Sequence, residues 1–243
     1  MADASGTIHM LKADCRAQFT ADDFHFVVRT LSRSKADAVP LSDLLADEDT
    51  RDCVLDHELV YREVMENGGC INVSPAFYFY VLLRRAFMRA GIDNRELTDY
   101  TAAVLVEFGR RAVSAKEGEA ATLFAYPYIS DLMIMLKDAG PWERLMIRAH
   151  IADYALFVSG IFPDRVRAQN RHRGGPDLRF YEEIGQSNYD AASKERLVDE
   201  TEHKLVFRRL GEQFHDVRRL LNHVADNVLH LSPHPHLLPA QAA

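Results

Sequence analysis

Hydrophobic residues recur three and four positions apart along most of the chain, which is the spacing of one face of an α-helix. The longest series lies near the C-terminus and comprises Val206, Leu210, Phe214, Val217, Leu221, Val224, Val228 and Leu231. Strict alternation of hydrophobic and polar residues, which is typical of half-buried strands, gives no convincing strand. The spacing therefore predicts an all-α fold, a globular bundle of about seven to nine helices with a long C-terminal helix.

Capping signals place the ends of the predicted helices. Thr20 precedes Asp22 and Asp23, an order typical of a helix N-terminus, where the helix dipole favours acidic side chains. Ser74 and Pro75 likewise fit the N-cap and the first position of a helix. The predicted helices cover residues 20–34, 41–66 with a break near 47–49, 74–91, 93–109, 120–137, 140–160, 177–188 and 193–231.

Two of these helices are apolar on every side. One contains Phe-Tyr-Phe-Tyr-Val-Leu-Leu at 77–83, and the other contains Tyr-Ala-Leu-Phe-Val at 154–158. Such a helix must lie at the centre of a fold or be covered by another subunit. We therefore expect a multi-layer bundle that forms a homo-oligomer, with part of this surface shared between subunits.

The composition is that of an ordinary globular protein, with 47% hydrophobic and 27% charged residues. We expect a single helical domain over 19–231, with flexible segments at 1–18 and 232–243. The net charge of −7 argues against a protein that coats DNA. Hydrophobic runs fall short of the ~18 residues that a membrane span needs. No membrane partner is therefore expected, and the expected location is cytoplasmic.

The sequence lacks the short motifs of several enzyme classes. It contains no GxGxxG, no GxxxxGK[ST], no GxSxG and no HExxH motif, which leaves dinucleotide-binding, P-loop, α/β-hydrolase and zincin functions without support. Three cysteines without zinc-finger or Cys-x-x-Cys spacing are typical of reduced thiols. The segment Asp56-His57-Glu58 is interpreted as a solvated flank, because Glu58 and Arg62 are an i, i+4 pair.

One set of residues has the spacing of a metal site. Glu200 and His203 are three residues apart, which places them one turn apart on one helix face, as metal sites in helical bundles require. His150 and Asp153 have the same spacing in the apolar helix at 140–160. Together the four side chains would supply two nitrogen and two oxygen ligands, which suits iron, manganese or zinc. The alternative is a buried histidine bonded to an aspartate that braces two helices.

A run of arginines suggests a second kind of site. Its members are Arg165, Arg167, Arg171, Arg173 and Arg179, beside a Gly-Gly-Pro break at 174–176. Guanidinium groups bind phosphate and carboxylate groups through paired hydrogen bonds. Arg84, Arg85 and Arg89 would add positive charge if the fold brought them close. The alternative is a solvated segment that pairs with the acidic residues of the chain.

These patterns support three hypotheses about function. The first is a non-catalytic helical protein that binds a partner protein or a small ligand as a regulator or adaptor, in a homodimer. The second is a helical-bundle metalloprotein of the oxidase or oxygenase type, built on His150, Asp153, Glu200 and His203. The third is phosphate or nucleic-acid contact through the arginine run, which the acidic net charge disfavours.

Overall fold

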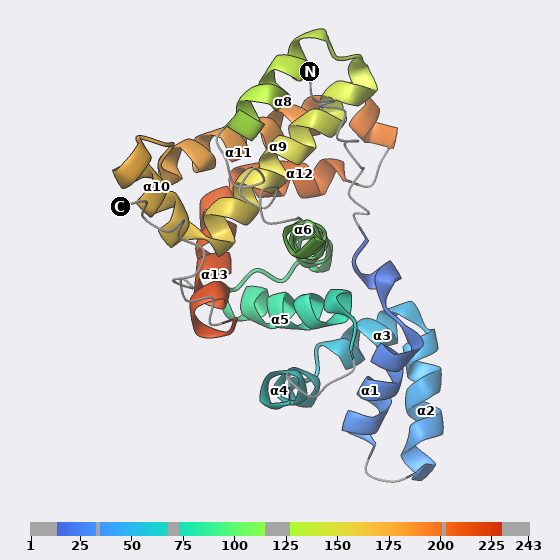
Figure 1. Ribbon diagram of the computed structural model, residues 1–243. Coiled ribbons are helices and arrows are strands. Elements are labelled where there is room, and N and C mark those ends of the chain that lie inside the picture. The colour runs from blue at the N-terminus through green and yellow to red at the C-terminus, as the bar shows by residue number, and fades with distance from the viewer. Residues whose placement is uncertain (1–13, 33–34, 68–72, 115–126, 201–202, 230–243) are drawn as a thin grey trace. The chain divides into compact units, whose positions relative to one another are not determined.

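The computed structural model describes residues 14–32, 35–67, 73–114, 127–200 and 203–229, and these residues form helices and no strand (Figure 1). The all-α fold predicted from the hydrophobic spacing is therefore confirmed. The chain divides into two compact units. We call Lys12–Glu107 the N-terminal unit, and the C-terminal unit is the one whose described part begins at Phe108. The single domain and the flexible ends expected from the sequence stay predictions.

Two helices of the N-terminal unit begin where Thr20 and Ser74 predict. The Thr20 side chain accepts the N–H of Asp23, and the Asp23 side chain accepts the N–H of Thr20. Ser74 Oγ accepts the N–H of Phe77. Each bond satisfies an N–H that the start of a helix leaves without a partner. The helices are η1 (Arg16–Gln18, a 3₁₀ helix), α1 (Ala21–Leu31), α2 (Lys35–Ala46), α3 (Glu48–Leu55), α4 (Glu58–Glu66), α5 (Pro75–Arg89) and most of α6 (Arg95–Ser114).

The helix predicted over 41–66 is three helices in the structure. Helix α2 contains Pro40, so the prediction that a helix starts after this proline is wrong. Proline removes one intrahelical hydrogen bond but does not always end a helix. Asp47 caps α3 through the N–H of Thr50, which confirms the break predicted near 47–49. A second break lies at His57, whose Nδ1 accepts the N–H of Leu59 at the start of α4.

Helix α5 is buried along most of its length, as its all-round apolar sequence predicts. Phe77 and Tyr80 meet Phe19 edge-on, with ring centroids 5.3 and 5.6 Å apart. Phe77 also meets Phe26 of α1 at 5.8 Å. These edge-to-face contacts bury large aromatic surfaces and fix the rings relative to one another. They hold α5 against α1 and against Phe19, which lies just before α1.

The C-terminal unit is built around α9. Every residue of α9 from His150 to Ile161 is buried, so this helix occupies the core position that its sequence predicts. Helices α8, α11 and α13 pack against it (Figure 1). The unit contains the end of α6 and the helices α8 (Pro127–Asp138), α9 (Pro141–Ile161), α10 (Pro163–Arg173), α11 (Leu178–Lys194), η2 (Arg196–Glu200, a 3₁₀ helix), α12 (Lys204–Glu212) and α13 (Phe214–Asn227).

Two glycines let these helices approach closely. A Cβ atom on Gly185 of α11 would lie 2.2 Å from the Phe214 ring, and a Cβ atom on Gly160 of α9 would lie 2.9 Å from Leu221. Both distances are shorter than carbon atoms tolerate. The missing side chains therefore allow residues of α13 to pack onto α11 and α9.

The single long helix predicted over 193–231 is wrong. Helix α11 ends at Lys194, the extended residue Glu195 follows it, and a further break at Gln213 separates α12 from α13. The hydrophobic series still marks the buried face, since Val206, Leu210, Phe214, Val217, Leu221 and Val224 are all buried. Spacing identifies the inward face, but it does not show where the helix axis changes direction. The described residues consequently hold twelve α-helices and two 3₁₀ helices, more than the seven to nine predicted.

Other predicted ends shift by smaller amounts. Helix α6 continues past 109 to Ser114, and residues 163–173, predicted only as a basic stretch, form α10. Residues 120–126 of the predicted fifth helix lie outside the described residues. No single helix among the described residues is long and apolar enough to span a membrane. Helices α9 and α10 meet that criterion only together, and they are bent by 93° at their junction.

Candidate functional site

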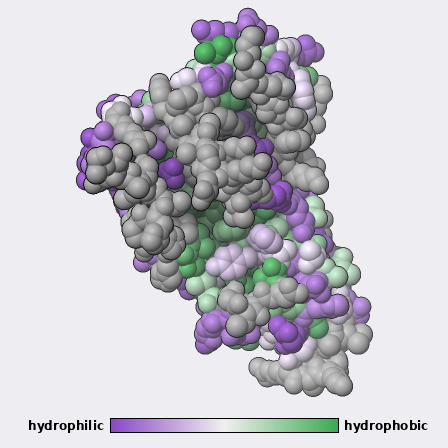
Figure 2. Space-filling view, in the orientation of Figure 1, coloured by the Kyte–Doolittle hydropathy of each residue, from purple (hydrophilic) through white to green (hydrophobic). Residues whose placement is uncertain are grey.

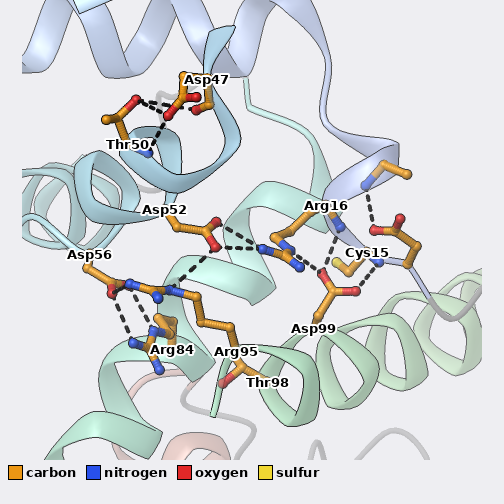
Figure 3. Close-up of polar contacts among 12 residues, drawn as sticks. Cys15, Arg16, Asp47, Thr50, Asp52, Asp56, Arg84, Arg95, Thr98 and Asp99 are labelled. Atoms are coloured by element: carbon orange, nitrogen blue, oxygen red, sulfur yellow. Dashed lines mark hydrogen bonds and ion pairs between the residues drawn. The ribbon is translucent and has the colours of Figure 1, made fainter. Parts of the chain in front are cut away.

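Paired arginine and aspartate side chains form a connected polar cluster in the N-terminal unit (Figure 3). Sequence reasoning missed this cluster. Its members come from η1, α3, α5, α6 and the residues beside these helices. We call it the arginine–aspartate network, and it consists of Arg16, Asp52, Asp56, Arg84, Asp93, Arg95 and Asp99.

Two of the arginines bind a carboxylate through two nitrogen–oxygen contacts. Arg16 Nη1 lies 2.9 Å from both oxygens of Asp52. Arg84 donates to the two oxygens of Asp56 at 2.8 and 2.9 Å. Arg95 joins these pairs, because it donates to Asp56 at 2.9 Å and lies 3.5 Å from Asp52. Arg84 and Asp52 are buried, and paired guanidinium–carboxylate contacts of this kind stabilise charges away from water.

Asp99 connects the network to the first described residues of the chain. Its carboxylate accepts the N–H of Cys15 at 3.0 Å and that of Arg16 at 2.9 Å. Burial raises the pKa of Asp99 to about 6, although these hydrogen bonds and the charge of Arg16 act in the opposite direction. Residues 15–18, which lie within the segment expected to be flexible, are thereby attached to α6.

Several buried polar atoms in and beside the network have no hydrogen-bond partner. They are the hydroxyl of Tyr80, Nη1 of Arg84, and the Nε atoms of Arg16 and Arg95. Burial raises the pKa of Tyr80, and its charged neighbours are Arg16, Asp52, Asp56 and Arg84. The guanidinium carbon of Arg16 lies 6.0 Å from the centroid of the Tyr80 ring, which places this ring beside the network. Burial likewise raises the pKa of the Cys15 thiol, which makes this thiol a poor nucleophile.

The network is suited to holding helices together rather than to catalysis. Arginine side chains do not give up their protons under ordinary conditions. Within the network, the carboxyl group with a raised pKa is that of Asp99, and it already accepts two backbone N–H groups. The interpretation of Asp56 as part of a solvated flank is wrong, because Asp56 binds both Arg84 and Arg95. Its partners come from distant parts of the sequence.

His150 and Asp153 are buried in α9, as the metal hypothesis requires, but their contacts serve packing. The His150 ring stacks on Phe108 at 5.5 Å. Burial and the charge of Arg111 lower the pKa of His150 to about 3, so its imidazole is neutral. Asp153 accepts a hydrogen bond of 2.7 Å from the Tyr189 hydroxyl of α11.

Glu200 and His203 belong to different described elements, and the two residues between them lie outside the described part of the chain. Glu200 ends η2, and His203 is the N-cap of α12, where its ring stacks on Phe207. The described side chains include no group of three His, Cys, Asp or Glu residues that could hold a metal ion. The side chain of Glu200 lies outside this description, so an iron, manganese or zinc site that includes it stays a prediction.

The arginine run lies on α10 and at the start of α11. Arg167 pairs with Asp164, and Arg179 pairs with Glu183, each at 2.7 Å. Arg171 is exposed, Arg165 is half-buried, and the side chain of Arg173 lies outside the described residues. Local pairs therefore neutralise the charges of Arg167 and Arg179. Anion binding by this run stays a prediction.

The three arginines of α5 have local partners within the N-terminal unit. Arg84 belongs to the arginine–aspartate network. Arg85 pairs with Glu58, and both Arg85 and Arg89 lie over the ring of Tyr61. Cation–π contacts of this kind stabilise the cations in place. Part of the charge that these arginines were expected to add to the arginine run is thus balanced locally.

A second candidate site is an apolar surface at the corner between α8 and α9. We call it the α8 surface, and it consists of Met133, Ile134, Met135 and Trp142, which are 40–60% exposed. Figure 2 shows hydrophobic atoms beside hydrophilic ones where Figure 1 draws this corner. Helix α8 buries Ile129 and Leu132, so the apolar residues at 133–135 are not needed to form its buried face. Sequence analysis did not predict this exposed apolar surface, although the run of apolar residues is visible in the sequence.

Comparison of the chain with protein-family models, with curated proteins and with solved structures finds no match. The functional inference therefore depends on the two sites themselves. One of them is a network whose charges bind one another, and the other is an apolar surface that faces solvent.

Proposed function

We propose that this protein is non-catalytic and acts by binding protein, and that its α8 surface pairs with the same surface of a second copy. The observation that carries this proposal is the exposure of Ile134, which is 60% exposed between two exposed methionines. Contiguous exposed apolar residues with a polar rim are typical of protein–protein contact sites. Tryptophan and methionine are also enriched at such interfaces.

The choice of a second copy as the occupant depends on charge. The exposed charged residues on either side of Ile134 in α8 are two acids, Asp131 and Asp138, and one base, Lys137. A surface that carries charges of both signs around an apolar centre can pair unlike charges with those of a second copy. A twofold contact uses the same patch on both subunits, and it therefore needs this self-complementarity.

The state of the ionisable groups supports a non-catalytic role. The arginine–aspartate network uses its charges in internal pairs, and His150 is stacked and neutral. Activated groups at catalytic sites are instead positioned to reach a substrate. These ionisable groups stabilise the fold, and the α8 surface is the part that is available to a partner.

Sedimentation velocity of the full chain over a range of concentrations tests the proposal. We expect the mass to rise from that of the 27.6 kDa chain toward twice this value as concentration increases. Ile134→Asp should abolish the rise, because it places a charge at the centre of the contact. The matched control is Leu205→Asp on α12, since Leu205 is 49% exposed but lies outside the α8 surface. A chain that remains monomeric at all concentrations would contradict the proposal.

A further inference from the structure

We infer that Met133 and Met135 are an oxidation-sensitive pair that controls the contact between two copies, with a hydroperoxide as the oxidant. The inference rests on the proposed function and deepens it, because it names how that contact is regulated. Oxidation of the two thioethers to sulfoxides separates the copies, and association of the copies protects the thioethers.

The exposure of these two methionines is the first observation. Met133 and Met135 are 41% and 40% exposed. The other methionines that the structure describes, Met65, Met88 and Met146, are half-buried. Because an oxidant must reach the sulfur atom, reaction with a dissolved peroxide is expected to be fastest at the two methionines of α8.

The position of the pair on α8 is the second observation. Successive residues of an α-helix lie about 100° apart around its axis, so one methionine flanks Ile134 on each side. Ile129 and Leu132 lie on the opposite side of the helix and are buried. A second copy that covers Ile134 therefore approaches both methionines, and all three residues belong to one contact.

Oxidation of each thioether is a balanced two-electron reaction. A lone pair of the methionine sulfur attacks the terminal oxygen of the hydroperoxide, the O–O bond breaks, and an S–O bond forms. The proton of the transferred oxygen passes to the departing oxygen, which leaves as water or as an alcohol. The sulfur is oxidised and the peroxide is reduced, so the reaction needs no other reactant.

The sulfoxide changes what the α8 surface presents to a second copy. A thioether is apolar and adapts to the shape of a contact, whereas a sulfoxide is polar and carries an oxygen that accepts hydrogen bonds. Covering this oxygen without a donor costs free energy. A twofold contact repeats this cost in both chains, so the oxidised surfaces associate less tightly.

Association in turn affects the oxidation. Contact between two copies removes Met133 and Met135 from water, so the peroxide reacts mainly with the monomer. The rate of oxidation at these positions should therefore fall as the concentration of the chain rises and the monomer fraction decreases. Met65 of α4 lies outside the α8 surface and supplies an internal reference.

Treatment of the full chain with hydrogen peroxide, followed by sedimentation velocity, tests the inference. Conversion of both methionines to sulfoxides, verified by peptide mass spectrometry, should raise the dimer dissociation constant about tenfold or more. Incubation with methionine sulfoxide reductases and a dithiol should restore the original value, because it regenerates the thioethers. A dissociation constant that the reductases do not restore would contradict the inference.

The double variant Met133→Leu with Met135→Leu is the matched control. Leucine keeps an apolar side chain of similar volume but has no sulfur atom. The variant should dimerise within about threefold of the original dissociation constant and should keep this value in peroxide. It retains Trp142 and the exposed thiol of Cys53. Loss of its dimer in peroxide would therefore assign the effect to another group and overturn the inference.

Oxidation rates give a second readout that needs no variant. Between concentrations well below and well above the dissociation constant, the rates at Met133 and Met135 should fall about fivefold or more, while the rate at Met65 stays constant. Equal rates at both concentrations, in a chain that sedimentation shows to dimerise, would contradict the inference.

Two outcomes separate failure of this inference from failure of the proposed function. If the oxidised chain dimerises as tightly as before while Ile134→Asp gives a monomer, oxidation does not control the contact and the proposed function stands. If the unoxidised chain is monomeric at every concentration, both are wrong.

Discussion

Asp99 shows how much one residue determines in the N-terminal unit. Its carboxylate accepts two backbone N–H groups and is 5% exposed, yet its pKa is raised from 3.8 to about 6. Desolvation of the charge therefore outweighs the attraction of its partners. A carboxyl group with a raised pKa contributes stability that is present below its ordinary pKa and is lost as pH rises through the raised value.

Asp99→Asn should remove this pH dependence. From pH 4 to pH 7 the original protein should lose about 2 kcal/mol of unfolding free energy that the variant does not lose, since one pKa unit corresponds to about 1.4 kcal/mol. Urea unfolding at both pH values, followed through the aromatic side chains, measures the difference. The substitution should thus be more destabilising at pH 4 than at pH 7, and an equal effect at both values would contradict the assignment.

At the scale of helices, packing of α11 against α13 depends on the absence of a side chain at Gly185. Alanine in place of glycine inside a helix normally stabilises it by about 1 kcal/mol. At Gly185 the added Cβ would lie 2.2 Å from the Phe214 ring. The ring cannot move without disturbing a close-packed core.

Gly185→Ala should therefore destabilise the protein by about 1–3 kcal/mol, which is typical of overpacking. Gly109→Ala in α6 is the matched control, because a Cβ at this helical glycine would meet nothing within 4 Å. That variant should be stabilised by about 0.5–1 kcal/mol. Thermal unfolding of the two variants under the same conditions compares them, and a destabilised Gly109→Ala would undermine the comparison.

The helices also show which features a sequence makes predictable. The starts of α1 and α5 were predictable because Thr20 and Ser74 bond to N–H groups only three residues away. The break at Gln213 was not predictable, since the hydrophobic spacing continues through it. The arginine–aspartate network was missed because its members are distant in sequence, as the separation of 83 positions between Arg16 and Asp99 illustrates. The charges that flank Ile134 were visible, but their exposure was not.

For the molecule as a whole, a fall in pH should change the stability of the two units in opposite directions. His150 in the C-terminal unit has a pKa lowered from 6.5 to about 3, so its contribution to stability is present above pH 6.5 and is lost as pH falls toward 3. The pKa of Asp99 in the N-terminal unit is shifted in the direction that favours the folded state at low pH. As the pH falls, this unit therefore gains stability over part of the same pH range.

Hydrogen exchange at pH 7 and pH 5, corrected for intrinsic rates, should resolve this difference. The opening free energy of α9 should fall by about 2 kcal/mol, and that of η1 and the adjoining part of α6 should rise by about 1 kcal/mol. In His150→Leu the change in α9 should disappear. Protection that moves in the same direction in both units would contradict the assigned pKa shifts.

The burial of α9 on all sides has a consequence for biosynthesis. The helices that cover it, α11 and α13, follow it in the chain, and the last of them ends at Asn227. At synthesis rates on the order of 5–20 residues per second, the apolar surface of α9 waits several seconds for its neighbours. During that interval the nascent chain exposes apolar residues of α9 that the folded protein buries. A ribosome-associated chaperone would therefore matter most for this protein between the translation of Ile161 and that of Asn227.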